Sequence, residues 1–484
     1  MSSNLPGYVA SAQPNPPTNR VPWFTSTAQT YAGIMLWFVF WQDVPTADGA
    51  PGGALAAGLG VALAGLVAAA LLAHFLYYLI PGLLGMKTGL PLYIVGTSTY
   101  GVQGGFFMPG FLMGVLQFGW LGVNACFSAA FLVQPFYADK GLMEVISTPP
   151  RIIVAILWAA LAAFMGLKGI QYVAKVASFL PLIPLVILIV LFIATVGGVG
   201  SYDVQQSIAA TGSNIQPLSA AAIFMLMLTY VLGFFATAGA AGCDFGMNNR
   251  DGKDVQLGGL AGITGATIFA GGLALLIVAG AHGAGKTGDL AQMNPTQLMG
   301  GVLGANVGAT FMYLLAIAAF PPACFAAFIA ANSLKTTLPN VNPFITVGIG
   351  TAVSILLAAT GWAAQVVTVF VIIGAAFGPV CGAMFADYML AGRKWAGPRA
   401  GFNMAGWISW VVGFCVGAFN GVLAIVAPTS VFANIVPVPP LSAFIVGFVL
   451  YFVLAKVGLE SRALPMPQRI DAGETAAPGG ATAT

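Results

Sequence analysis

Long apolar runs, each bounded by charged residues, Pro or Gly, occupy most of this 484-residue sequence. A helix needs about 20 mostly apolar residues to cross a bilayer, and runs of about that length recur along the chain. Only 6% of the residues are charged, whereas a soluble domain carries about 25%. The pattern therefore predicts an all-α integral membrane protein. It excludes a soluble enzyme, a nucleic-acid binder and a disordered protein.

The apolar runs predict twelve transmembrane helices. Their approximate limits are 30–48, 53–82, 104–134, 150–168, 171–197, 217–242, 257–282, 301–331, 343–361, 364–390, 403–427 and 441–459. The segment 90–103 is too short to span a bilayer and is expected to lie along the interface. Residues 1–22 and 460–484 are expected to be disordered tails on either side of a membrane domain at 23–459.

The basic residues predict the orientation of these helices, because cytoplasmic loops of membrane proteins are enriched in Lys and Arg. With the N-terminus in the cytoplasm, 13 of the 16 basic residues fall on the cytoplasmic side. The other three are Lys140, Arg151 and Lys286. This asymmetry favours an even number of helices, a cell-membrane location and two cytoplasmic termini.

Two of the predicted helices contain an interruption within the apolar run. In the first, at 30–48, Gln42 and Asp43 are followed by Pro45; in the sixth, at 217–242, the small residues Ala236 to Gly242 lead into Asp244. Broken helices five positions apart are typical of transporters built from two inverted repeats, in which the substrate binds at the breaks. The alternative is that these helices simply tolerate Gly and Pro. A third irregularity, Pro321–Pro322, is expected to kink the eighth helix.

Asp43 is a candidate coupling group. A carboxylate in the middle of a membrane helix is costly, so such residues usually line a water-filled route or titrate. Asp43 is predicted to carry a proton during transport or to contact a basic edge of the substrate. The alternative is that the first helix ends early and Asp43 caps it. Asp244 and Asp387 are interpreted as structural residues that pair with nearby cations such as Arg250 or Arg393.

The sequence contains no pattern that indicates membrane-embedded catalysis or a metal site. The five cysteines form no CxxC pair, and the two histidines and the few acidic residues are dispersed along the chain. We therefore expect no metal, no cofactor and no enzymatic activity. A repeated filter motif that would indicate a channel is also not visible.

Several motifs resemble the nucleobase:cation symporter-1 family, which includes permeases for cytosine, purines, uracil and allantoin and transporters of hydantoins. The segment Gly119-Trp-Leu-Gly-Val-Asn124 is similar to the family's third-helix signature. Ala386-Asp387-Tyr388, followed by Phe402-Asn403, is similar to its tenth- and eleventh-helix region, and the matches run in the family's order over about residues 30–420. The resemblance implies a five-plus-five inverted-repeat fold with discontinuous first and sixth helices. The repeats would occupy about 30–197 and 217–390, and two more helices would occupy 403–459.

The resemblance also implies a substrate site. Trp120 and Phe235 correspond to the positions at which family members sandwich a flat ring, and amide side chains read the edge of such a ring. The candidate substrate-binding residues are Trp120, Asn124, Phe235, Gln42, Asn332 and Gly239. The alternatives are that the aromatic residues fill the core or face lipid, and that the amides join helices.

One departure from the family pattern bears on the coupling ion. Sodium-coupled members carry hydroxyl side chains at two positions of the eighth helix, where this sequence has Ala326 and Ala327. Alanine side chains supply no oxygen ligand, so proton coupling is favoured over sodium. The sequence thus predicts a monomeric symporter for a small planar nitrogen heterocycle, working by alternating access. A transporter of another small amine or amino-acid derivative, and a membrane receptor that does not transport, remain alternatives.

Overall fold

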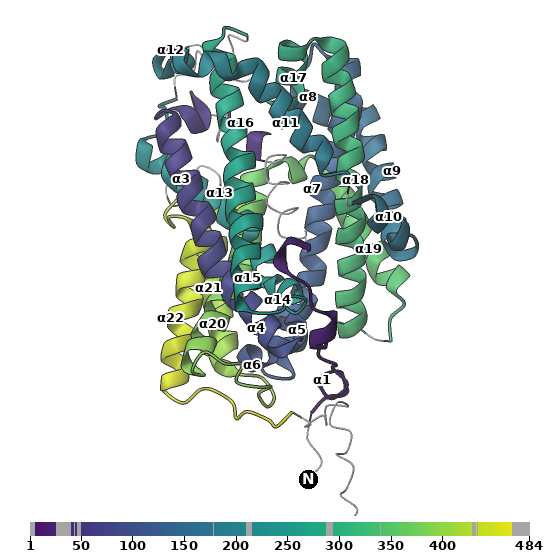
Figure 1. Cartoon of the computed structure of the whole chain (residues 1–484), viewed down its shortest axis with the longest axis vertical. Helices are drawn as coiled ribbons and strands as arrows, with labels where there is room; N and C mark the ends of the chain where they lie inside the picture. The colour runs from purple at the N-terminus through teal and green to yellow at the C-terminus, as the bar shows by residue number, and fades with distance from the viewer. Residues whose placement is uncertain are drawn as a thin grey trace, which may run out of the picture.

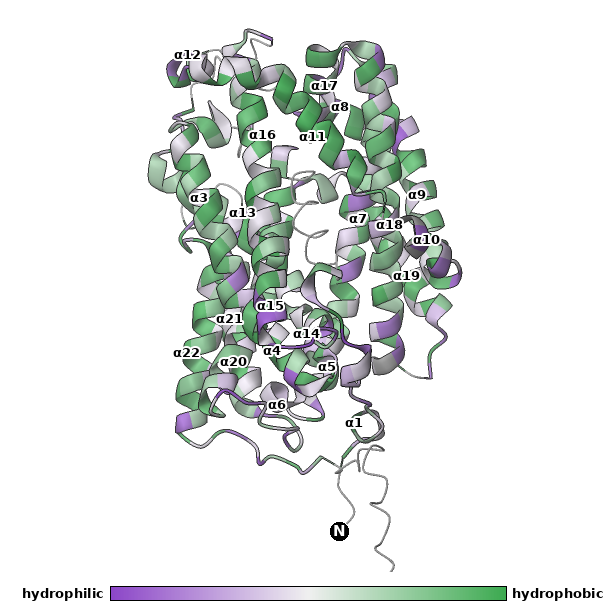
Figure 2. Cartoon of the chain, viewed as in Figure 1, coloured by the Kyte–Doolittle hydropathy of each residue, from purple (hydrophilic) through white to green (hydrophobic). Residues whose placement is uncertain are grey.

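The computed structural model is an all-helical bundle whose long helices run side by side (Figure 1). It describes residues 5–25, 40–42, 44–45, 50–177, 179–209, 215–286, 294–338, 340–427, 432 and 434–466. Within these residues, ten helices are long and apolar enough to cross a membrane, and α19 is a shorter apolar helix. Hydrophobic residues dominate the long helices over most of their length (Figure 2).

The spanning helices are built from the following α-, 3-10 and π-helical elements. They are α3 (Leu59–Leu72), η5 (Ala73–Tyr78), α4 (Leu79–Thr88), η6 (Phe106–Phe111), α7 (Leu112–Val133), η7 (Gln134–Tyr137), α9 (Pro149–Lys168), α11 (Leu182–Thr195), η8 (Val196–Ser201), α13 (Ala220–Ala240), α15 (Gly252–Gly259), η9 (Leu260–Gly265), α16 (Ala266–Gly283), α18 (Ala305–Thr337), α19 (Pro343–Ala359), α20 (Val366–Leu390), α21 (Met404–Val426) and α22 (Pro439–Lys456).

Shorter elements connect the spanning helices or lie at their ends. They are α1 (Gly7–Ala10), η1 (Pro17–Asn19), η2 (Trp23–Thr25), η4 (Gly53–Leu55), α5 (Leu92–Val95), α6 (Thr97–Tyr100), α8 (Leu142–Ile146), α10 (Ile170–Ala177), α12 (Val204–Ala209), α14 (Gly242–Gly246), α17 (Pro295–Leu303) and η11 (Trp362–Ala364). The segment predicted not to span, 90–103, contains the four-residue helices α5 and α6.

Most of the predicted helices correspond to observed ones, with one clear difference. The predicted helix at 171–197 is divided into α10 and α11, and Pro181 directly precedes Leu182, the first residue of α11. Proline has no amide proton to donate, so it suits the start of a helix rather than its interior. The helix predicted at 30–48 falls largely outside the described residues. The count of twelve and the inverted repeat therefore stay predictions.

The break predicted in the sixth helix lies at Ala241. Helix α13 ends at Ala240, and α14 begins at Gly242. Because α13 alone has 21 residues, enough to cross a bilayer, the break lies near one end of the span rather than at its middle. Helix α18, in contrast, continues through Pro321 and Pro322 as one 33-residue element.

The N-terminal segment is folded against the bundle, so the prediction of a disordered tail over 1–22 is wrong for residues 5–22. Val9 is fully buried. The Arg20 guanidinium donates to the Met86 carbonyl at 2.6 Å, and the Asn15 amide donates to the Met247 carbonyl at 3.0 Å. Polar side chains thus anchor this segment by binding carbonyls at the ends of membrane helices, an interaction that composition does not reveal.

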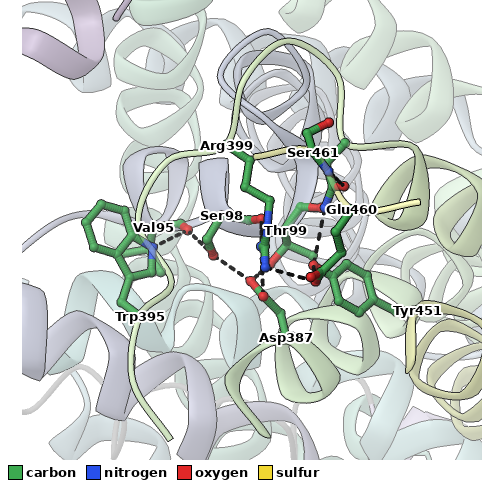
Figure 3. Close-up of polar contacts among 10 residues, drawn as sticks. Val95, Ser98, Thr99, Asp387, Trp395, Arg399, Tyr451, Glu460 and Ser461 are labelled. Atoms are coloured by element: carbon green, nitrogen blue, oxygen red, sulfur yellow. Dashed lines mark hydrogen bonds and ion pairs between the residues drawn. The ribbon is translucent and has the colours of Figure 1, made fainter. Parts of the chain in front are cut away.

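Asp387 is structural, as predicted, but its partner is Arg399 rather than Arg393. Arg399 contacts the Asp387 carboxylate at 2.8 Å and Glu460 at 2.9 Å, and Ser98 donates to Asp387 at 2.7 Å (Figure 3). The Arg399 and Asp387 side chains are 7% and 4% exposed. This network joins α20, the turn of α6 and the segment after α22. Part of the predicted C-terminal disordered tail is thus held in place: Glu460 belongs to this network, and Leu464 and Met466 pack against the core.

Candidate substrate cavity

A cavity of about 540 Å³ lies between two groups of helices. One wall is formed by η6, α7 and α18, and the other by α5, the end of α13, and α14. The lining residues are Leu92, Tyr93, Pro109, Gly110, Met113, Gln117, Trp120, Thr237, Ala238, Ala241, Asp244, Phe245, Ile329, Asn332, Ser333 and Lys335. Its lining residues run from Trp120, within α7, to residues of α5 and α14, two helices near the end of the bundle that carries the N-terminal segment (Figure 1). Its volume is typical of a site for a small molecule.

Trp120 marks the inner end of the cavity, where it joins a cluster of aromatic rings. Its indole lies 5.2 Å from the ring of Phe234 and 5.6 Å from that of Phe370, measured between ring centroids. Phe370 contacts Tyr230, which in turn contacts Phe40. Apart from half-buried Trp120, every ring of this cluster is at most 9% exposed. The aromatic cluster is therefore a buried layer packed against Trp120.

Polar side chains are few and reach the cavity from both walls. Gln117 and Trp120 lie one turn apart on α7, and the Trp120 indole N–H donates to the Thr237 hydroxyl at 3.3 Å. This bond bridges α7 and α13 and fixes the plane of the indole. Asn332 adds an amide from α18. An apolar cavity with one flat aromatic side chain and a few donors and acceptors is suited to bind a flat polar ring.

Asp244 contributes a carboxylate to this cavity, and it is not paired with Arg250 as predicted. Arg250 instead contacts Asp254 at 2.8 Å, one turn further along the chain. One Asp244 oxygen accepts the Leu92 amide N–H at 3.3 Å. Burial raises the pKa of Asp244 from the usual 3.8 to about 6, because desolvation disfavours the charged form.

The described residues contain no group of three or more His, Cys, Asp or Glu side chains that could hold a metal ion.

Comparisons with known proteins identify the family. A family model described as permease for cytosine/purines, uracil, thiamine, allantoin matches residues 21–398, most of the chain. The chain belongs to this family. The predicted resemblance to the nucleobase:cation symporter-1 family is thereby confirmed, and the chain is a permease of this family rather than an enzyme.

Relatives and solved structures agree with this assignment. The cytosine permease of Escherichia coli strain K12 is 26% identical over 323 residues, which cover 65% of this chain and 67% of that protein. The inward-facing conformation of Mhp1 superposes with a TM-score of 0.65 at 15% identity, over 96% of this chain and 97% of that one. Mhp1 in a closed conformation with bromovinylhydantoin bound gives a TM-score of 0.57 at 15% identity, over 94% and 97%. At such low identity the two structures establish the fold of this symporter-1 member and no more.

The cavity of this symporter-1 member brings together two of the predicted substrate residues, Trp120 and Asn332. Asn124 does not line it. Its amide donates to the Ala319 carbonyl at 2.9 Å and accepts from the Trp158 indole at 3.0 Å. These bonds join α7 to α18 and α9. The alternative stated for this amide, that it joins helices, therefore describes its contacts in the structure. The role of Asn124 in substrate binding stays a prediction.

Phe235 and Gly239 also lie away from the cavity lining. Phe235 is fully buried, and Phe234, its neighbour in the chain, contacts Trp120 instead. Gly239 packs so closely against Tyr77 of η5 that a Cβ atom at this position would overlap its side chain. Gln42 is 8% exposed and lies outside the lining residues. Asp43 lies outside the described residues.

Sequence reasoning overlooked Gln117 and Thr237 as cavity residues of this permease and assigned Asp244 a structural role. The spacing of Gln117 and Trp120, three residues apart on one helix, could have placed both on one face. Thr237 is the one hydroxyl in the run of small residues where the break was predicted. The position of Asp244 depends on how α14 turns after the break, which the sequence pattern does not specify.

Proposed function

We propose that this protein is a secondary active transporter that moves a small planar nitrogen heterocycle, such as a nucleobase, allantoin or hydantoin, across the cell membrane by alternating access. The cavity is the observation that carries the proposal. It presents the Trp120 indole together with the Gln117 and Asn332 amides. A flat ring can stack on the indole while the amides, which both donate and accept, bind its polar edge.

The difference in exposure between the two ends of the cavity supports alternating access. The aromatic cluster of Phe40, Trp120, Tyr230, Phe234 and Phe370 closes one end, whereas Asn332 and Lys335 are exposed toward the other. A transporter of this kind exposes its site to one side at a time. The opposite state would require the aromatic cluster to separate and the walls at Lys335 and Asp244 to approach each other.

We propose that the open end faces the cytoplasm, that both termini are cytoplasmic and that the protein works as a monomer. The N-terminal segment and the end of α22 lie at this same end of the bundle (Figure 1). The distribution of basic residues favours the cytoplasm for this side.

We further propose that transport is coupled to protons rather than sodium, with Asp43 as the coupling group. The lack of hydroxyls at Ala326 and Ala327 supports this proposal. Both alanines are buried in an apolar cluster with Leu121 and Ala162, so neither position offers an oxygen ligand to sodium. Replacing Asp43 with Asn should abolish pH-dependent accumulation, and full accumulation with an unchanged pH profile would refute this role.

A thermal-shift screen of the purified protein tests the proposed substrate class. Purines, pyrimidines, hydantoins and allantoin are each added with and without sodium at two pH values, and amino acids and non-cyclic amines are added in the same way for comparison. A ligand that binds only the folded state raises the melting temperature by mass action, by an amount that grows with concentration above the dissociation constant. We expect at least one flat heterocycle to stabilise the protein without sodium. Stabilisation by an amino acid or a non-cyclic amine alone would favour the alternative solute class.

A further inference from the structure

The geometry of the cavity points to Asp244 as the residue that selects the substrate's edge. We infer that it favours flat heterocycles that present two adjacent N–H donors, such as a ring-protonated aminopyrimidine or an aminopurine with a ring N–H beside its amino group, over imide rings such as uracil or hydantoin. This inference rests on the proposed function and names a narrower substrate class for the same cavity.

The Asp244 carboxylate is positioned to contact a ligand in the cavity. Asp244 is half-buried on the short helix α14 and lines the same cavity as Trp120. The Leu92 amide N–H binds its Oδ1 atom at 3.3 Å, which holds the carboxylate against α5. The contact leaves further acceptor capacity on the carboxylate, because an ionised carboxyl group has about four lone-pair sites.

The charge of the Asp244 carboxylate is not balanced by an ion pair among the described residues. Among the described residues the ion pairs are Arg250 with Asp254, and Arg399 with both Asp387 and Glu460. Asp244 takes part in none of them. Lys335 is the other charged residue among those that line the cavity, and it lies on the opposite wall. Tyr93 and Cys243 are titratable groups that interact electrostatically with the carboxylate. A half-buried carboxylate without a cation is costly, so a ligand that supplies donors lowers that cost.

The acceptors of a carboxylate match a ring edge that carries two adjacent N–H donors. A carboxylate accepts two parallel N–H groups in a bidentate arrangement, and charge-assisted bonds of this type are among the strongest in proteins. An aminopyrimidine that is protonated at the ring nitrogen beside its amino group, or an aminopurine with a ring N–H there, offers such an edge. An imide offers one N–H flanked by two carbonyl oxygens, which the carboxylate repels. Gln117 and Asn332 can serve either kind of ring, so the discrimination comes from Asp244.

The experiment measures affinity for two matched pairs of ligands. Cytosine is compared with uracil, and guanine with xanthine, by competition binding to the full-length protein in detergent. The variants are Asp244→Asn, which keeps the size but replaces one acceptor with a donor, and Asp244→Ser as an independent second change. Glu144→Gln, at an exposed position of α8, is the matched control that removes a carboxylate elsewhere.

We expect the unaltered protein and the Glu144→Gln control to prefer the amino ring in each pair. Both Asp244 variants should reduce that preference at least tenfold. If the variants bind ligand and keep the original preference, or if the unaltered protein prefers the imide rings, the inference is overturned while the proposed function stands. If the protein binds none of these four rings but binds hydantoin or allantoin, the inference is overturned and the proposed function stands. A protein that binds no flat heterocycle at all overturns both.

Discussion

Single residues determine how the cavity can hold a ring, and Trp120 is the main one. It is half-buried, its indole contacts Phe234 and Phe370, and its N–H donates to Thr237. One face of the cavity is thereby a rigid aromatic surface. The family signature on α7 predicted this residue, because the motif Gly119 to Asn124 fixes its identity and its place on the helix.

Replacing Trp120 with Ala should weaken ligand binding by about 1–3 kcal/mol, because stacking of a base on an aromatic side chain has about that value. This corresponds to a loss of affinity of roughly 5- to 150-fold. Trp120→Phe keeps a ring and loses only the bond to Thr237, so it should stay within a few-fold of the original affinity. Equilibrium binding measures both. Equal affinities for the Ala variant and the unaltered protein would show that Trp120 does not contribute to ligand binding.

The raised pKa of Asp244 predicts a pH-dependent effect on stability. A pKa of about 6 in the folded state means that folding disfavours the ionised form. The contribution of this group to stability is therefore complete below the usual value of 3.8 and is lost as the pH rises through about 6. Asp244→Asn cannot ionise, so it should melt at a higher temperature than the unaltered protein at pH 7.5.

The difference in melting temperature between Asp244→Asn and the unaltered protein should decrease as the pH is lowered toward 4. Melting curves recorded in one detergent across this range, with Glu144→Gln as the control, measure it. An advantage that is independent of pH would show that the carboxylate is not desolvated.

At the scale of elements, helix positions follow from the sequence, whereas helix ends and contacts between helices do not. Apolar length identified α9, α19 and α20 to within about two residues, because a span needs a minimum of apolar residues. The division of α10 from α11, and the direction of α14, depend on packing. The sequence predicted a structural role for Asp387, and the structure agrees. It named Arg393 as the partner instead of Arg399, because contacts between distant segments also depend on packing.

The network around Arg399 is predicted to stabilise the end of the bundle that carries α6, α20 and the segment after α22. Arg399→Met leaves the Asp387 carboxylate buried without its cation, and removing one partner of a buried ion pair costs about 3–5 kcal/mol. Arg250→Met breaks an ion pair in which the arginine side chain is 53% exposed, so its cost should be at most about 1 kcal/mol.

The melting temperatures of the two variants, measured side by side in detergent, test this difference. The Arg399 variant should melt clearly below the Arg250 variant. Equal melting temperatures would mean that the network around Arg399 contributes little to stability.

At the scale of the whole molecule, the sequence predicted a membrane permease of this family, and the family match confirms it. The membrane could be inferred because scarcity of charge is a property of the entire chain. The cavity could be inferred only in part. Trp120 and Asn332 were named from motifs, whereas Asp244, Gln117 and Thr237 come together only when α7, α13, α14 and α18 are assembled.

The most direct test of the account is counterflow in proteoliposomes that contain the purified protein. Vesicles are loaded with an unlabelled heterocycle identified by the thermal-shift screen, and uptake of the labelled compound is followed over time. We expect a transient accumulation of label that requires the internal substrate and is strongly reduced by Trp120→Ala. Saturable binding of the heterocycle with no exchange across the membrane would contradict it, because the protein would then be a receptor rather than a transporter.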